Sequence, residues 1–256
     1  MIASLGMYDR AETAQANDRL WAGIRDALRA GGGDAPQILT RGEGAYWPAW
    51  QDPALVFSQT CGYPYRAILH EKVTLIGTPD YGLPGCPPGH YNSVFIARKD
   101  DPRQDLIAFR DAAFAFNEAL SQSGWAAPQN HAAAMGFHFA PTLMSGGHRL
   151  SALAVAEGRA DIAAIDALTW EMLQRWEGWC EGLREVARTG PTPALPFIAA
   201  KGADGQALFA ATKAAIAGLS AQDRETLHLR DVVRIGSDAY LGVPSPPGPA
   251  QIAQPR

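Results

Sequence analysis

Short apolar runs alternate with longer stretches in which apolar side chains recur every three or four residues. The short runs have the length of buried strands. They lie at Ile2–Met7, Gln37–Thr40, Leu55–Ser58, Val73–Ile76, Ser93–Ala97, Phe114–Asn117, Ile162–Ile165 and Pro196–Ala199. The helical patterns cover 11–28, 125–135, 147–158, 207–219 and 222–227. Such alternation predicts an α/β fold with mixed, mostly parallel sheets.

Two segments rich in proline and glycine, 82–89 and 189–193, predict crossings between domains. The chain would then form two Rossmann-like lobes. The first is discontinuous, 1–88 plus 192–256, and the second, 89–191, is inserted into it. We expect a ligand site in the cleft between the lobes, which two hinge crossings would allow to close. The proline-rich tail from Pro244 to Pro249 is expected to be loose or draped over the surface.

The composition of the chain indicates which classes of binding partner are not expected. The net charge of -4 provides no broad basic face, so we expect no nucleic-acid partner. No apolar run reaches the ~18–20 residues of a membrane span, so direct membrane insertion is not expected. The histidines lack metal-site spacing, and no cofactor is indicated. We expect a monomer.

The compartment and the cysteine chemistry stay open at this stage. Residues 1–7 lack the features of a signal peptide. The protein would be periplasmic if this is a mature exported chain and cytoplasmic if Met1 is the native start. Cys61 and Cys86 could form a disulfide that leaves Cys180 free, or all three could be reduced thiols.

A candidate anion site begins where a predicted strand ends at Asn117. The turn Ser121-Gln122-Ser123-Gly124 then leads into a helix that starts near Trp125. Serine hydroxyls and the free N–H groups of the first helical turn can converge on an oxyanion, helped by the helix dipole. The alternative is an ordinary serine N-cap without a ligand.

Further candidates stand at the ends of other predicted elements. His148 follows Gly146-Gly147 at a helix start, where it can donate to an anion or serve only as a cap. Asp166 ends a strand and begins a helix, so it is either an N-cap, a ligand contact, or both. Tyr63 and Tyr65 flank a proline in a turn, where each hydroxyl can reach a ligand or each ring can simply pack.

Five segments together resemble a known family. They are 57–65, 91–98, 116–124, 145–149 and 154–166. In order and spacing they resemble the substrate-binding proteins of ABC importers for phosphate, phosphite and phosphonates, which have the type II periplasmic-binding-protein fold. The resemblance runs from about Met1 to about Ala200.

The resemblance implies roles for particular residues. Ser121, Ser123 and His148 would hold the oxyanion, with Asn117 beside them. Gln122 replaces a small hydroxyl residue, so one donor would be an amide. Asp166 would face the other end of the ligand. The opposite wall would be lined by three tyrosines, Tyr8, Tyr63 and Tyr65.

The leading hypothesis is a solute-binding protein that captures a small anionic ligand, such as a phosphonate or phosphate ester, between closing lobes. It would deliver the ligand to an ABC permease and catalyse no reaction. The alternatives are a cytosolic enzyme on the same fold, similar to transferases or pyrimidine-precursor synthesis proteins, and a ligand sensor. Cys61 is the one nucleophile considered for the enzyme hypothesis.

Overall fold

The computed structural model describes residues 1–253 of the chain and divides it into two compact units. The first unit comprises Met1–His90 and Pro193–Gly242, and the second comprises Tyr91–Thr192 together with the chain from Val243 onward. The predicted first lobe included all residues from 192 to 256, and this was wrong for the tail. Side chains of the second unit donate hydrogen bonds to the backbone of Pro244 and Pro247, which fixes the tail there.

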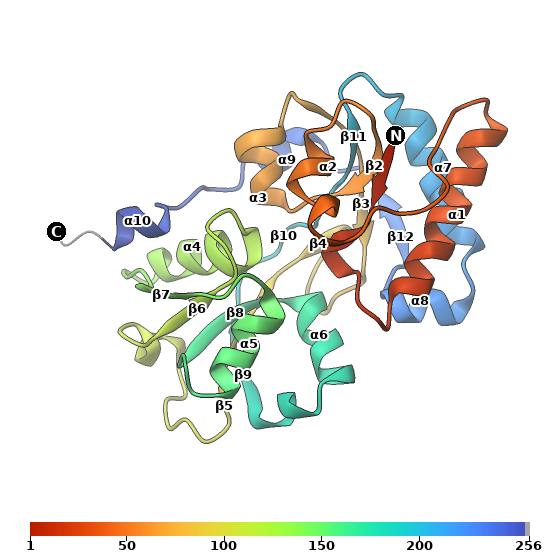
Figure 1. The fold of residues 1–256 in the computed structure, drawn as a ribbon. Coiled ribbons are helices and arrows are strands. Elements are labelled where there is room, and N and C mark those ends of the chain that lie inside the picture. The colour runs from red at the N-terminus through yellow and green to blue at the C-terminus, as the bar shows by residue number, and fades with distance from the viewer. Residues whose placement is uncertain (254–256) are drawn as a thin grey trace. The chain divides into compact units, whose positions relative to one another are not determined.

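The first unit is built on a five-stranded sheet (Figure 1). Its order is β1 (Ile2–Ser4), β2 (Leu55–Gln59), β11 (Phe197–Ala200), β3 (Val73–Asp80) and β12 (Asp231–Val233). Strand β1 pairs with β2 in parallel, whereas β11 runs antiparallel to both β2 and β3.

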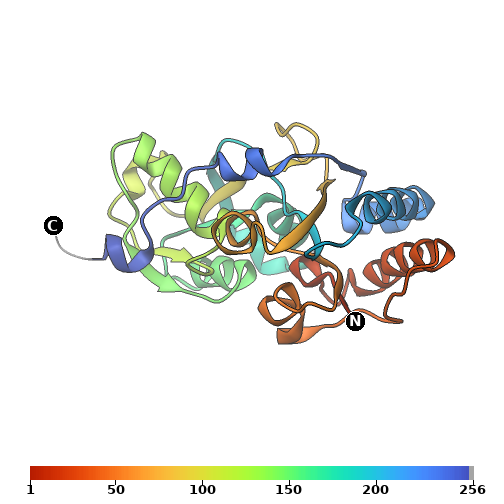
Figure 2. The same ribbon diagram turned by 90° about the horizontal axis from the view of Figure 1, so that it is seen from above.

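Helices cover this sheet. The helices α1 (Ala14–Ala30) and α7 (Gly205–Gly218) lie side by side, and α8 (Ala221–Leu227) contacts α1 (Figure 2). A Cβ at Gly23 would stand 3.0 Å from the Cβ of Ala215, so glycine lets α1 and α7 approach closely.

The remaining elements of the first unit are short. They are η1 (Gly6–Tyr8), η2 (Gly42–Ala45), α2 (Trp47–Trp50), α3 (Gly62–Pro64), the π-helical turn η3 (Tyr65–Leu69) and α9 (Ser237–Leu241). Several of them contribute to one buried cluster, made of Ala49, Trp50, Leu55, Tyr65, Leu69, Ile198 and Tyr240.

The second unit has its own five-stranded sheet. Its order is β7 (Pro141–Met144), β6 (Phe114–Phe116), β8 (Ile162–Asp166), β5 (Ser93–Arg98) and β9 (Leu183–Arg188). Strand β6 is parallel to β7 and β8, and β5 is antiparallel to β8 and β9. Every residue of β8 is buried, as expected for a strand covered on both faces.

Three helices pack in this second unit, namely α4 (Ala127–Ala134), α5 (His148–Ala156) and α6 (Ala167–Trp176). Shorter helical segments are η4 (Leu106–Phe109), η5 (Gln122–Ala126), η6 (Gly178–Gly182) and α10 (Pro249–Ile252). The strands β4 (His90–Tyr91) and β10 (Thr192–Pro193) pair where the chain passes between the units.

The α/β class and the mixed sheets are confirmed, but the sheets are less parallel than predicted. The chain enters β5 and β11 from the other unit and not through a crossover helix. Both strands are antiparallel to their neighbours. The predicted strand at Gln37–Thr40 was wrong. Thr40 N–H donates to Ala3 O, but the segment forms no strand. Strands β7, β9 and β12 were missed because their sequences carry no continuous apolar run.

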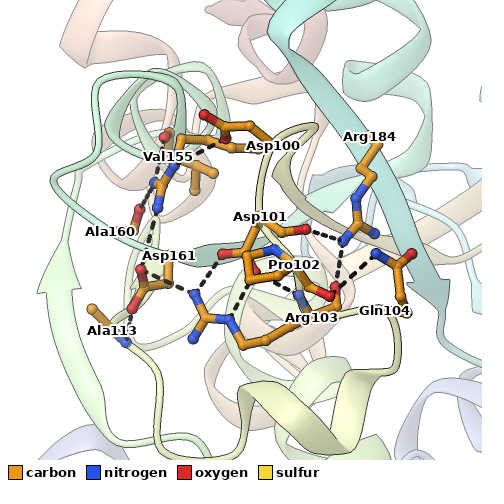
Figure 3. A network of polar contacts seen from close by, with 11 residues as sticks. Asp100, Asp101, Pro102, Arg103, Gln104, Ala113, Val155, Ala160, Asp161 and Arg184 are labelled. Atoms are coloured by element: carbon orange, nitrogen blue, oxygen red, sulfur yellow. Dashed lines mark hydrogen bonds and ion pairs between the residues drawn. The ribbon is translucent and has the colours of Figure 1, made fainter.

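An ion network ties together the end of the second sheet where β5 finishes and β8 begins (Figure 3). Arg98 donates to the carbonyl oxygens of Val155 and Ala160 at 3.0 and 2.8 Å and pairs with Asp161 at 3.4 Å. Arg103 pairs with the buried Asp101 at 2.5 Å. These contacts hold the pKa of Asp101 at about 2, chiefly through its hydrogen bonds from Arg103.

Candidate anion-binding site

Polar side chains gather at the other end of the second sheet. Asn117 follows β6, and Asp166 is the last residue of β8. Ser93, the first residue of β5, pairs in register with Asp166, because β5 runs antiparallel to β8. Asn92 precedes Ser93, and both are buried. Sequence reasoning missed Asn92 and Ser93. They lie at the start of a strand, and only the antiparallel direction of β5 places that start at the same end of the sheet as Asp166.

The turn after Asn117 is a helix start in which Ser121 is the N-cap. Its Oγ accepts the N–H of Gly124 at 2.9 Å, and the π-helical turn η5 follows and runs directly into α4. The serine N-cap, which the sequence offered as the alternative to a ligand site, is therefore present at Ser121. A hydroxyl that accepts one hydrogen bond still has its own proton to donate, so the cap does not exclude a ligand contact. Gln122 is buried in the same turn.

Ser123 connects this turn to α5. Its Oγ lies 2.8 Å from Nε2 of His148, the first residue of α5. Burial lowers the pKa of His148 to about 4, although a backbone contact with Ala164 opposes the shift. The imidazole is consequently neutral at physiological pH, and the Ser123–His148 hydrogen bond joins two neutral groups.

Gly124 makes this convergence possible. A Cβ at position 124 would stand 1.9 Å from Oδ1 of Asn117 and 3.2 Å from Cε1 of His148. The missing side chain of Gly124 leaves the space that Asn117 and His148 occupy against this turn. The turn from Ser121 to Gly124, with Asn117 and His148, is called the cradle below.

Several buried polar atoms around the cradle lack a hydrogen-bond partner among the described residues. They are Oδ1 of Asn117, Oδ1 of Asn92 and Oγ of Ser93. An unsatisfied buried polar atom costs about 1–3 kcal/mol. The two amide oxygens need a hydrogen-bond donor, and the Ser93 hydroxyl can donate or accept, so this end of the sheet is suited to a polar ligand that carries a donor as well as an acceptor.

Asp166 has a defined structural role at the start of α6. Its Oδ1 accepts the N–H of Thr169 at 2.9 Å, and the side chain is buried. The N-cap interpretation is therefore present in the structure. A contact between this carboxylate and a ligand stays a prediction.

The tyrosines predicted for the opposite wall belong to the first unit and have unequal surroundings. Tyr8 packs edge-on against Tyr81 at 5.4 Å between ring centroids. The guanidinium of Arg66 lies 4.2 Å from the ring centroid of Tyr63. A ligand contact by Tyr8 or Tyr63 stays a prediction.

Tyr65 is more enclosed than Tyr8 and Tyr63. It is 3% exposed, belongs to the core cluster of the first unit, and packs its ring 5.1 Å from that of Tyr240. Burial raises the pKa of its hydroxyl. Neighbours of its own unit enclose the ring, which favours the packing alternative, and a contact between the Tyr65 hydroxyl and a ligand stays a prediction.

Two polar residues at the end of β2 were also missed. Gln59 Nε2 donates to Tyr81 Oη at 2.7 Å and to Leu195 O at 3.1 Å. Thr60 follows it, fully buried, with no partner for its Oγ1 among the described residues. The apolar run predicted for this strand ended one residue before Gln59, so the polar pair was assigned to the following turn.

The structure also places the three cysteines and the side chains that could bind a metal. In the part of the chain that the structure describes, Cys61, Cys86 and Cys180 form no disulfide, so the alternative of a Cys61–Cys86 bridge is not what the structure holds. Cys61 is buried, which disfavours a nucleophilic role. Among residues 1–253, no group of histidine, cysteine, aspartate or glutamate side chains is arranged to hold a metal ion. Within the same range no helix has the length and hydropathy needed to span a membrane.

Comparisons with known proteins place this chain among binding proteins. A family model described as "ABC transporter, phosphonate, periplasmic substrate-binding protein" matches residues 56–238. A search of curated proteins found no match.

Solved structures share the fold at low sequence identity. PhnD1 from Prochlorococcus marinus in complex with methylphosphonate aligns with a TM-score of 0.71 at 15% identity, over 93% of this chain and 94% of that one. A Xanthomonas citri protein bound to ATP gives a TM-score of 0.67 at 17% identity, over 94% and 98%. A binding protein component of a phosphonate ABC transporter from Pseudomonas aeruginosa gives 0.65 at 16%, over 93% and 83%.

Proposed function

Because the chain belongs to the family of periplasmic substrate-binding proteins of phosphonate ABC transporters, we propose that it binds a small phosphorus oxyanion and delivers it to an ABC permease. The ligand class is a phosphonate or a phosphate ester. The protein acts as a monomer in the periplasm and performs no chemistry on its ligand.

The observation that carries this proposal is the cradle of the second unit. Ser121 and Ser123 lie at a helix start with one residue between them. Nε2 of His148 lies 2.8 Å from Oγ of Ser123. A phosphonate presents three oxygens around one phosphorus, which matches hydroxyl, imidazole and N–H donors that converge on one point. No lysine or arginine belongs to the cradle, so neutral donors and the helix dipole provide the attraction.

Binding changes the proton distribution of the Ser123–His148 pair. In the free protein the histidine is neutral, because burial lowers its pKa to about 4. A bound oxyanion favours the imidazolium, which can donate to a ligand oxygen. The ligand therefore binds together with a proton, and the resulting ion pair lies within a partly buried turn.

A thermal-shift panel tests the proposal. It comprises methylphosphonate, aminoethylphosphonate, phosphite, phosphate, a phosphate monoester, sulfate and a dicarboxylate. A ligand at about 100 times its Kd adds about 2.7 kcal/mol to the stability, which is a shift of several degrees. Shifts confined to the phosphorus oxyanions support the proposed function. Shifts with the other anions and none with phosphorus compounds would refute the ligand class.

A further inference from the structure

The C-terminal segment starts from a firm anchor in the first unit. Tyr240 of α9 is 1% exposed, donates from its Oη to Ala194 O at 2.9 Å, and lies 2.6 Å from Thr78 Oγ1. Its ring lies against Gly62, where a Cβ would stand 3.7 Å away. Tyr240 therefore fixes α9 against the turn that follows β2.

A few residues further on, the chain is anchored in the second unit at the cradle's own helix. The indole Nε1 of Trp125 donates to Pro247 O at 3.1 Å. Asn130 Nδ2 donates to Pro244 O at 2.8 Å, and Pro246 between these two carbonyls is buried. We call residues 243–253 the C-terminal strap.

Trp125 is the residue that brings the strap to the ligand site. It stands two positions after Ser123 in the turn η5, and it is 0% exposed. One side of its ring packs on the sheet, 4.8 Å from the ring of Phe116, the last residue before Asn117. Any shift of Trp125 moves the backbone that carries Ser123 and Gly124.

The composition of the strap suits a fixed contact better than a loose tail. Prolines occupy positions 244, 246, 247 and 249. Each proline fixes its φ angle, so the free strap has few conformations to lose when it docks. The hydrogen bonds go to backbone carbonyls of Pro244 and Pro247, which remain strong acceptors although proline has no N–H.

We propose that the C-terminal strap positions the cradle, so that docking of the strap and binding of the phosphorus oxyanion strengthen each other. Trp125 is the positioning residue through which the strap acts, and it does not contact the ligand itself. The proposal rests on the function proposed above. Coupling between two binding events is reciprocal, so the ligand must hold the strap as strongly as the strap improves ligand affinity.

Two variants separate this role from simple stabilisation. A chain that stops after Val243 lacks the docking carbonyls, and Trp125→Phe keeps an aromatic ring but removes the Nε1–H donor. A chain without residues 254–256 is the matched control for shortening. Circular dichroism establishes that each variant is folded, and methylphosphonate binding is then measured by titration calorimetry.

The expected result is at least a fivefold rise in Kd for the chain ending at Val243 and for Trp125→Phe, the lower end of typical couplings between sites. The control should keep the wild-type Kd. A synthetic peptide of residues 243–253, added in excess, should restore the affinity of the truncated chain. In hydrogen exchange, methylphosphonate should slow the exchange of strap amides in the wild-type protein.

The outcomes that would overturn the proposal are distinct from failure of the proposed function. If wild-type protein binds methylphosphonate and both folded variants bind it within twofold, the strap does not position the cradle. The same conclusion follows if the truncated chain does not fold and Trp125→Phe keeps the wild-type Kd. If the wild-type protein binds no phosphorus oxyanion at all, the proposed function fails and the strap proposal falls with it.

Discussion

Ser123 Oγ and His148 Nε2 lie 2.8 Å apart, although 25 positions separate them in the chain. The parallel pairing of β6 with β7 brings them together, because His148 follows β7 closely and Ser123 lies in the turn beyond β6. Ser145 N–H and Gly146 N–H donate to the carbonyls of Phe116 and Asn117, which extends the alignment past both strands. One hydrogen bond thus joins the two turns that form the proposed oxyanion site.

The pH dependence of binding follows from this pair. The pKa of His148 is about 4 in the free protein and rises when the anion binds, so one proton is taken up between these two pKa values. Lowering the pH within that window should decrease Kd by up to about tenfold per unit. Calorimetry in buffers of different ionisation enthalpy measures the proton uptake.

His148→Gln is the matched variant, since glutamine keeps a hydrogen-bonding group but does not titrate. The ratio of its Kd to the wild-type Kd should rise as the pH falls, and this ratio cancels the ionisation of the ligand itself. A ratio that stays constant from pH 5 to pH 8 contradicts proton uptake by His148.

Gly124→Ala should disrupt the cradle. The new Cβ would stand 1.9 Å from Asn117 Oδ1, so either the side chain or the helical turn must move. We expect a loss of about 1–3 kcal/mol in stability, the usual cost of overpacking, and a large loss of phosphonate affinity. Urea unfolding and calorimetry measure the two effects.

Gly218→Ala is the control for adding a methyl group. Gly218 ends α7, and a Cβ there would meet no atom within 4 Å. This variant should be as stable as wild type or slightly more stable, with unchanged affinity. An equally mild result for Gly124→Ala would show that the cradle tolerates displacement.

The ion network at the far end of the same sheet should govern acid stability. The pKa of Asp101 is lowered from 3.8 to about 2, so its stabilisation is complete above pH 3.8 and is lost as the pH falls toward 2. The shift corresponds to about 2 kcal/mol. At pH 7, Asp101→Asn should be less stable than the wild type by about that amount. The difference between the two proteins should disappear as the pH falls toward 2. Urea unfolding across this pH range checks it, and a pH-independent difference would contradict the assignment.

Closure of the two lobes remains a prediction from the sequence, where two crossings were expected to act as hinges. Saturation with a bound phosphonate should reduce the radius of gyration in small-angle scattering. The strap-truncated chain provides a comparison, because it lacks the C-terminal connection to the second unit. An unchanged radius in wild-type protein at saturation would argue against closure.

Sequence reasoning succeeded where burial dictates the pattern. The run at 162–166 is buried at every residue, and such runs are recognisable without any alternation. Gln37–Thr40 also looks apolar, yet Ile38 is 73% exposed and the segment stays outside the sheet. An apolar run therefore predicted a strand correctly only where the folded chain buries that run.

The candidate site was predicted in part for a related reason. Residues that follow a strand, such as Asn117 and Asp166, can be found from sequence because strands of one direction end together. Ser93 begins its strand and joins them only because β5 runs antiparallel. Whether a tyrosine such as Tyr65 packs or faces a ligand depends on neighbours distant in sequence, including Tyr240, and no local pattern reveals them.

The most direct test of the central claim is titration of methylphosphonate into wild-type protein, Ser123→Ala and Ser220→Ala. Ser220 caps α8 by accepting the N–H of Asp223 at 3.0 Å, so its loss should cost about 1 kcal/mol of stability and leave Kd unchanged. Ser123→Ala should weaken binding by about 1–2 kcal/mol, roughly five- to thirtyfold, because a donor to a charged oxygen is lost. Equal affinity in the wild-type protein and Ser123→Ala, or no binding by the wild-type protein, would contradict an oxyanion site at the cradle.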